Sequence, residues 1–271
     1  MIFEAAPLPQ LALGAAEHAL PSFFLLLALA WAASWAGWCG LRRVQARRQA
    51  LVVLARPGIG WRVAFGLLIS LGAAAVFAVL ASHLGAGAGL SRADQALTDA
   101  LRITVTPLTQ QVFAWLTHLA DPATLVLLGL GIALVLVLRG QRALALGWVL
   151  ALVGNSMLNP ALKQVFGRVR PLELHRLVVA PGLSFPSGHS SGAVVAYGML
   201  AYLALKLLPA RWQLPALLAA VTLVLTVGTS RLFLRVHFAS DVLAGFASGT
   251  AWLALCVTVI EWVLWRRAGR S

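Results

Sequence analysis

Apolar residues fill seven long stretches of this chain, and each stretch approaches the ~20 residues that a helix needs to cross a bilayer. The stretches are 21–41, 61–84, 122–138, 143–162, 189–208, 214–231 and 240–264. Segments rich in Pro, Gly and Arg separate them, and those at 139–142 and 209–213 are short enough to form tight hairpins. The pattern predicts an all-α integral membrane protein with seven transmembrane helices.

The segment 85–121 is more polar, yet apolar residues recur in it at helical spacing. One series consists of Leu97 and Leu101, and a second consists of Leu108, Val112, Trp115 and Leu119. We therefore expect a helical extracytoplasmic segment around 92–120, made of one or two helices. These helices either lie along the outer membrane interface or pack over the end of the bundle.

The composition excludes an ordinary soluble domain. Hydrophobic residues make up 61% of the chain and charged residues 11%, and the mean hydropathy is +0.88, whereas about a quarter of a soluble protein is charged. The net charge of +13 comes from arginines at the ends of apolar stretches and not from a separate basic domain, so we expect no nucleic-acid partner. Cys39 and Cys256 lie in apolar segments without metal-site spacing, and we expect buried, inert thiols.

Positive charge is distributed unevenly about the apolar stretches. If the seven helices alternate in direction, 13 of the 21 basic residues lie on one side of the membrane. These are Arg42, Arg43, Arg47, Arg48, Arg56, Arg62, Arg139, Arg142, Lys206, Arg211, Arg266, Arg267 and Arg270. Because basic loops stay in the cytoplasm, we expect an extracytoplasmic N-terminus and a cytoplasmic C-terminus, in a bacterial inner membrane. The first stretch has no basic residue before it, so we expect a retained anchor and not a cleaved signal peptide.

Other ionisable residues gather in three clusters at the ends of apolar stretches. The clusters are Lys163, Arg170 and Pro171; then Pro186, Ser187, Gly188 and His189; then Ser230, Arg231, His237 and Asp241. Charges at the edges of membrane segments are costly enough to indicate function. The alternating topology places all three clusters on the extracytoplasmic side, and convergence of distant segments on one face is what a site requires.

The first cluster carries two cations suited to an anion. Lys163 and Arg170 lie seven positions apart, so a helix that continued past the membrane edge would bring both to one face before Pro171 ended it. A guanidinium binds phosphoryl oxygens in pairs, and an ammonium adds a point charge. This favours a phosphate site, with snorkelling toward lipid headgroups as the alternative.

The other two clusters each carry a histidine. Ser187 and Gly188 open the fifth stretch, where the free N–H groups of a helix start bind anions, and His189 projects from the first turn. His237 precedes Asp241 by four positions, which places imidazole and carboxylate on one helical face. A carboxylate on one ring nitrogen leaves the other as a nucleophile or base. The alternatives are an interface anchor for the first histidine and a structural ion pair for the second.

Together the three clusters resemble the type 2 phosphatidate phosphatase superfamily, whose signatures are K-x6-RP, PSGH and SR-x5-H-x3-D. All three occur here in order and without substitution, from Lys163 to Pro171, from Pro186 to His189 and from Ser230 to Asp241. The resemblance covers six apolar stretches, roughly 61–264. It implies a six-helix phosphatase-type core at 57–271, preceded by an extension at 1–56 with one additional transmembrane helix and a basic cytoplasmic linker.

The resemblance also implies a role for each motif residue. His237 would attack phosphorus and form a phosphohistidine, Asp241 would orient His237, and His189 would protonate the leaving oxygen. The phosphoryl oxygens would be held by Lys163, Arg170, Arg231, Ser187 and the Gly188 amide. The family works without metal, so we expect no cofactor, and the sequence shows no carboxylate cluster able to hold magnesium.

These observations predict an integral-membrane lipid phosphatase that hydrolyses a phosphomonoester or diphosphate of a lipid. Phosphatidate, phosphatidylglycerophosphate, undecaprenyl diphosphate and lipid A 1-phosphate are all candidate substrates. The expected partners are therefore the lipid phosphate and the bilayer, and nothing indicates an oligomeric state. The connection 163–188 is a candidate lid or headgroup filter, and the role of the first apolar stretch stays open.

Three other functions are compatible with parts of this pattern. A lipid phosphotransferase would use the same site and pass the phosphoryl group to another lipid. A transporter for an anionic solute could use the same cations, but transporters bind near the bilayer midplane and often contain inverted repeats. Here the charges lie at one edge and no repeat is visible. Vanadate-dependent haloperoxidases share the motifs but are expected to be soluble.

Overall fold

The computed structural model describes residues 8–51, 59–85, 89–171 and 181–268, and these ranges contain helices and no strand. The helices are α1 (Leu8–Glu17), α2 (Ala19–Leu51), α3 (Gly60–Ser82), α4 (Gly89–Thr104), α5 (Pro107–Leu116), the 3-10 helix η1 (Thr117–Ala120), α6 (Pro122–Leu138), α7 (Arg142–Phe166), α8 (Gly188–Leu207), α9 (Ala210–Phe233) and α10 (Ala239–Ala268). The expected domain boundary after residue 56 and the middle of the candidate lid, 172–180, lie outside the described ranges. The division into 1–56 and 57–271 stays a prediction.

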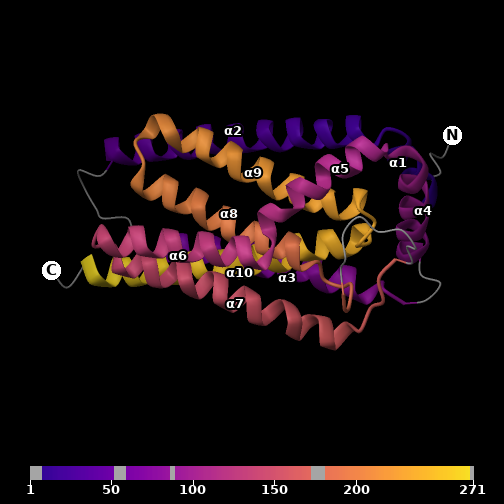
Figure 1. Ribbon diagram of the computed structural model, residues 1–271. Coiled ribbons are helices and arrows are strands. Elements are labelled where there is room, and N and C mark those ends of the chain that lie inside the picture. Colours follow the sequence, from indigo (N-terminus) through magenta and orange to yellow (C-terminus); the bar gives the residue numbers. More distant parts are fainter. Residues whose placement is uncertain (1–7, 52–58, 86–88, 172–180, 269–271) are drawn as a thin grey trace.

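Seven helices run along one axis of the molecule and correspond to the seven apolar stretches (Figure 1). Within the described ranges, six of them are long and apolar enough to cross a bilayer alone: α2, α3, α7, α8, α9 and α10. The exception is α6, which has 17 residues. It becomes long enough together with α5 and η1, from which a bend of 44° separates it. The prediction of an all-α protein that spans a membrane several times is confirmed.

Glycines on α10 let its backbone approach the backbone of α8 closely. A Cβ atom on Gly245 would lie 2.6 Å from the carbonyl oxygen of Ser187, and one on Gly249 would lie 2.9 Å from that of Ser191. Only glycine tolerates such an approach. Because Asp241 lies in the first turn of α10, this contact holds its carboxylate beside the start of α8.

The polar segment before α6 folds into helices that cover one end of the bundle. Helix α4 lies across that end, next to α1 (Figure 1), and also contacts α9 and α10. Helix α5 packs along α9. Of the two expected arrangements, packing over the end of the bundle describes the sides of these helices that contact α9 and α10. Their outer faces leave Ile103 88% and Trp115 74% exposed, as expected for side chains at a membrane interface.

The additional N-terminal helix, α2, packs against α9. Phe23 on α2 makes an edge-to-face contact with Phe113 on α5, at 5.6 Å between ring centroids, and Phe113 makes a second with Phe233 on α9, at 4.8 Å. Farther along, the Trp31 indole N–H donates to Thr222 Oγ1 at 3.0 Å. The extra helix is therefore fixed to the same bundle that carries the motifs.

The two cysteines differ from the expectation. Cys39 and Cys256 are free thiols, as expected, but both are partly and not fully buried. Cys39 lies on α2 and Cys256 on α10, two helices that are long and apolar enough to cross a bilayer. The exposed part of such a helix faces lipid, which an apolar thiol tolerates as well as a protein core.

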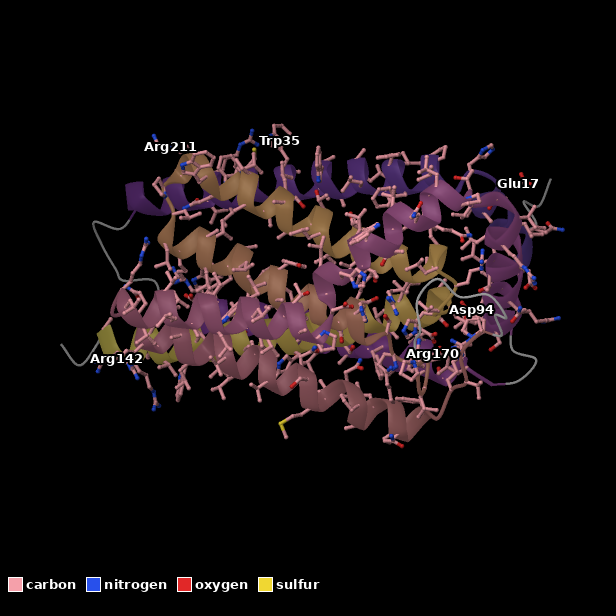
Figure 2. The ribbon with its side chains drawn as sticks, viewed as in Figure 1. Glu17, Trp35, Asp94, Arg142, Arg170 and Arg211 are labelled. Carbon is pink, nitrogen blue, oxygen red and sulfur yellow. The ribbon has the colours of Figure 1, made fainter. Side chains whose placement is uncertain are left out.

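The two ends of the bundle differ in charge. Arg142 and Arg211 lie at one end, whereas Asp94 and Arg170 lie at the other (Figure 2). At the first end, Glu261 on α10 accepts from Tyr202 Oη at 2.7 Å and pairs with Lys206 at 2.5 Å and with Arg62 at 3.3 Å. This cluster joins α3, α8 and α10 at the end that the charge distribution predicts to be cytoplasmic.

Candidate active site

A cavity of about 1000 Å³ opens at the end of the bundle where the three motifs meet. Its polar end is lined by Lys163, Arg170, Gly188, His189, Arg231 and His237, together with His118 and Asp121. From there it continues between α6 and α7, where apolar side chains such as Leu130 and Val149 form its wall. The cavity therefore joins a charged end to an apolar slot.

His237 lies in the turn between α9 and α10 and is 2% exposed. Its Nδ1 is 3.3 Å from Asp241 Oδ2, and its Nε2 is 2.9 Å from Arg170 Nη1. A guanidinium only donates, so this geometry fits a neutral ring with its proton on Nδ1 and an Nε2 lone pair that accepts from Arg170. Both residues line the cavity. An imidazole in that tautomer is a nucleophile.

Burial lowers the pKa of His237 from 6.5 to about 3, because removal from water disfavours the imidazolium. The carboxylate of Asp241 acts in the opposite direction, and the charges of Arg170 and Arg231 reinforce the effect of burial. His237 is therefore neutral at physiological pH, and its nucleophilic form is present without prior loss of a proton.

Asp241, which is fully buried, receives several donors besides His237. Its Oδ1 accepts from Arg168 Nη1 at 2.7 Å, and its Oδ2 accepts from the Ser184 hydroxyl and from the Phe238 amide at 2.9 Å. A buried carboxylate needs such compensation to remain ionised. The network fixes the carboxylate in the orientation that meets the imidazole.

Arg168 extends this network to a second buried carboxylate. Its Nη2 lies 2.8 Å from Asp94 Oδ2, and its Nη1 also donates to Ser240 Oγ at 2.6 Å. Asp94 in turn accepts from the Ser240 amide at 3.0 Å and from the Ser240 hydroxyl. One guanidinium thus bridges Asp94 on α4 and Asp241 on α10.

The predicted phosphate-binding cations contact neutral oxygen atoms. Lys163 Nζ donates to the Leu183 carbonyl at 2.8 Å, and Arg170 Nη1 donates to the Val236 carbonyl at 2.7 Å. Arg231 is 2% exposed and donates through Nη1 to Thr117 Oγ1 at 2.7 Å. Its buried Nε has no hydrogen-bond partner among the residues that the structure describes. These contacts orient the cations without neutralising them.

Ser187 and His189 begin α8 and differ in their geometry. The Ser187 hydroxyl is fully buried and accepts from the Ser190 amide at 3.4 Å and from the Ser190 hydroxyl at 2.9 Å, so it caps the helix. It does not line the cavity, whereas Gly188 does. His189 also lines the cavity, and its Nε2 lies 2.8 Å from Asp121 Oδ1.

The structure brings together six of the eight predicted site residues at the polar end of the cavity: Lys163, Arg170, Gly188, His189, Arg231 and His237. Asp241 lies directly behind His237, and Ser187 supports the start of α8. In the described part of the chain, no three His, Cys, Asp or Glu side chains are grouped to hold a metal ion.

Four ionisable residues of the site are not singled out by the sequence: Asp94, His118, Asp121 and Arg168. A signal existed for Asp94, because it lies three positions before Leu97 and seven before Leu101, on the apolar face of a helix. A buried carboxylate there requires a partner. Arg168 stands inside the first cluster, but its side chain turns toward Asp241 and not toward the cavity. Asp121 carried no local signal beyond its position before a helix.

Comparison with known proteins places this architecture in a family. The model of the PAP2 superfamily matches residues 142–265. Phosphatidylglycerophosphatase B of Bacillus subtilis is 33% identical over 180 residues, which cover 64% of this chain and 85% of that protein. The chain belongs to the PAP2 superfamily. The resemblance inferred from the three motifs is thereby confirmed.

Two further PAP2 comparisons agree with this assignment. A crystal structure of a transmembrane PAP2-type phosphatidylglycerolphosphate phosphatase from Bacillus subtilis has a TM-score of 0.65 and is 30% identical, with 72% of this chain and 97% of that chain covered. The lipid A 1-phosphatase of Rhizobium johnstonii is 32% identical over 133 residues, which cover 44% of this chain and 50% of that protein. The PAP2 model begins at Arg142, so Asp94 and Asp121 precede it.

Loss of the Arg168 guanidinium should destabilise the protein. In Arg168→Ala, Asp94 and Asp241 lose the cation that they share, and an uncompensated buried charge costs ~3–5 kcal/mol. We expect a clear fall in the temperature of thermal unfolding in detergent. Arg102→Ala, which removes an exposed guanidinium from α4, is the matched control and should unfold with the wild type. An unchanged unfolding temperature for Arg168→Ala would contradict the bridging role.

The lowered pKa of His237 predicts a histidine that does not titrate in the usual range. Histidine-selective 15N NMR of the six histidines should include two rings that stay neutral at pH 5, because burial also lowers the pKa of His189 to about 4. The signal of the ring that stays neutral to the lower pH should disappear in His237→Ala. Between pH 6.5 and about 3 the folded protein holds fewer protons here than the unfolded chain, so this group's contribution to stability falls as pH is lowered through that window. A resonance of His237 that titrates near pH 6.5 would contradict the assignment.

Proposed function

We propose that this protein is an integral-membrane lipid phosphatase that cleaves a phosphate ester or diphosphate of an amphiphile through a phosphohistidine on His237. The observation that carries the proposal is the cavity, which joins a cation and histidine cluster to an apolar slot between two membrane-spanning helices. Only an amphiphilic substrate occupies both parts. The PAP2 family and the names of its matched relatives support the same class of substrate.

The first chemical step forms a bond between His237 Nε2 and phosphorus while the bond to the leaving oxygen breaks. Lys163, Arg170 and Arg231 meet the charge on the equatorial oxygens, which is the main requirement of phosphoryl transfer. Arg170 Nη1, which now faces Nε2, donates to a phosphoryl oxygen once the substrate separates them. The electron pair of the broken bond stays on the leaving oxygen, which takes a proton from His189.

The second step returns the enzyme to its starting state. Water attacks phosphorus, the bond from phosphorus to His237 breaks, and the proton of the water passes to His189. Asp241 holds the Nδ1 proton of His237 throughout, because its carboxylate stays ionised among its donors. The chain's own residues therefore supply the nucleophile, the acid and the anion-binding groups, and the scheme uses no metal.

The orientation follows from charge. The end opposite the site carries Arg142, Lys206 and Arg211 on its helix termini, and basic loops stay cytoplasmic. We therefore place the site on the extracytoplasmic face of a bacterial inner membrane, level with the lipid headgroups. Phosphatidylglycerophosphate is the first substrate to test, since the relative with 85% of its length matched is named for it. Phosphatidate, undecaprenyl diphosphate and lipid A 1-phosphate complete the panel.

The function is tested by phosphate release from this lipid panel in detergent micelles with EDTA present. We expect turnover that vanadate inhibits, loss of all turnover in His237→Ala, and radiolabel from a labelled lipid on His237 after rapid acid-free quenching. His189→Ala should slow release of alkyl leaving groups on the order of a hundred- to ten-thousandfold. His83→Ala, which alters an exposed histidine outside the cavity, is the control.

Two results would refute the scheme: activity that EDTA abolishes, or rapid turnover without a labelled histidine. Label that appears in a second lipid instead of free phosphate would identify a phosphotransferase with the same intermediate.

The apolar slot predicts a separate effect on substrate length. Val153 lines the cavity on α7, so Val153→Trp should obstruct the slot and lower kcat/KM for a long-chain lipid phosphate about tenfold or more, as lost apolar contacts of ~1–3 kcal/mol imply. A water-soluble short-chain phosphate should be hydrolysed nearly as before. Val165→Trp, on the same helix but outside the cavity and 75% exposed, is the matched control. Equal losses for both substrates would show that the slot does not hold the chain.

A further inference from the structure

A second carboxylate, besides Asp241, contacts a histidine of the site. Asp121 lies between η1 and α6, and both of its oxygens face histidines. Oδ1 lies 2.8 Å from His189 Nε2, and Oδ2 lies 2.6 Å from His118 Nδ1. All three side chains line the cavity. The arrangement places an ionisable group directly on the histidine that serves as the acid.

The position of Asp121 in the fold does not by itself explain this geometry. Asp121 is the N-cap residue of α6, where an aspartate usually accepts from an amide two or three residues later. Its side chain makes no such capping bond. Both carboxylate oxygens are instead directed at imidazole nitrogens, one of them on a different helix and 68 residues away. The carboxylate is therefore arranged for the histidines and not for its own helix.

We propose that Asp121 is a positioning residue that fixes the ring of His189 and its tautomer for proton transfer. This inference rests on the proposed function, in which His189 is the acid. A hydrogen bond from Nε2 to Asp121 leaves Nδ1 to face the leaving oxygen, and Nδ1 has no hydrogen-bond partner in the described part of the chain.

The proton balance uses one nitrogen for both steps. His189 donates the Nδ1 proton to the leaving oxygen, and the neutral ring keeps its second proton on Nε2, where Asp121 accepts it. Nδ1 then carries the lone pair that takes a proton from the attacking water in the second step. Without Asp121 the neutral ring could place its proton on either nitrogen, and the tautomer with Nδ1 protonated cannot act as the base.

His118 completes the arrangement from the other side of the carboxylate. Its side chain is 56% exposed, and it occupies Asp121 Oδ2, which leaves Oδ1 for His189. Burial, and after it the nearby guanidinium of Arg231, lower the pKa of His189 from 6.5 to about 4, and the hydrogen bond and charge of Asp121 act in the opposite direction. His189 is therefore neutral at rest, and Asp121 favours its protonated form in a site whose burial and cations oppose that form.

Two substrates whose leaving groups differ in their need for a proton distinguish this positioning role from a purely structural one. The alkoxide that leaves from hexadecyl phosphate needs a proton. In Asp121→Asn, kcat/KM for this ester should therefore fall on the order of ten- to a hundredfold, which is part of the rate factor that a general acid contributes. The same variant should hydrolyse p-nitrophenyl phosphate within about threefold of the wild type, because a phenolate leaves without a proton. Because kcat/KM covers only the steps through formation of the phosphohistidine, the second step does not enter the comparison.

Three further variants complete the design. Asp121→Asn added to His189→Ala should cause no further loss, since residues that act through one another are not additive. Asp121→Glu should recover part of the activity toward the alkyl ester. Asp99→Asn, a change of an exposed carboxylate on α4, should leave both esters unaffected. Equal losses for the two esters in Asp121→Asn, or additive losses in the double variant, would overturn the proposal.

The ring of His189 gives a readout that does not depend on turnover. 15N NMR of the wild type should show a neutral His189 with its proton on Nε2, and Asp121→Asn should show a mixture of tautomers. If the tautomer is fixed by Asp121 but no lipid phosphate is hydrolysed, the proposed function fails while the positioning by Asp121 stands. An unchanged His189 spectrum in Asp121→Asn would overturn the positioning role even in an active enzyme.

Discussion

The site depends on one buried carboxylate, Asp241, which joins all three motif segments. Its side chain accepts from Arg168 in the first segment, from Ser184 before α8 and from the Phe238 amide beside His237, and its main-chain oxygen accepts from the Ser187 amide at 2.9 Å. An ionised carboxylate this deep is stable only with such donors. The same bonds that satisfy the charge therefore fix the register of the loop 168–171, the start of α8 and the turn before α10.

The bilayer explains why so much of the architecture could be predicted. A membrane-spanning segment must be long, apolar and internally hydrogen-bonded, so the stretch 214–231 is the helix found at Ala210–Phe233. The expectation that His237 and Asp241 share one helical face was wrong, because α10 begins at Ala239. The two side chains meet all the same, since the turn before α10 brings His237 Nδ1 to 3.3 Å from Asp241 Oδ2. Contacts between distant segments were not predictable. The pairing of Asp94 with Arg168 spans 74 residues and depends on how α4 lies across the bundle. No local pattern encodes that packing.

The serine of the second motif shows a different limit. Ser187 was expected to hold a phosphoryl oxygen, but its hydroxyl accepts from the Ser190 amide. The first N–H groups of a helix have no partner within it, and a serine at the N-cap is the usual acceptor. The structure describes only the capping use, in which the oxygen accepts. The hydroxyl keeps its own proton as a donor, so its role toward a phosphoryl oxygen stays a prediction. Of the groups predicted to bind the anion at this point, Gly188 lines the cavity at the helix start and Ser187 does not.

The two histidines of the site face their carboxylates in opposite ways. His237 turns Nδ1 to Asp241 and keeps Nε2 for the cavity, whereas His189 turns Nε2 to Asp121 and keeps Nδ1. Asp241 is fully buried, and the side chain of Asp121 is 34% exposed at the rim of the cavity. A nucleophile benefits from the dry site, where its ring stays neutral. A group that first gives and then takes a proton must work where water enters. The difference in burial therefore suits the His237–Asp241 pair to nucleophilic attack and the His189–Asp121 pair to proton transfer.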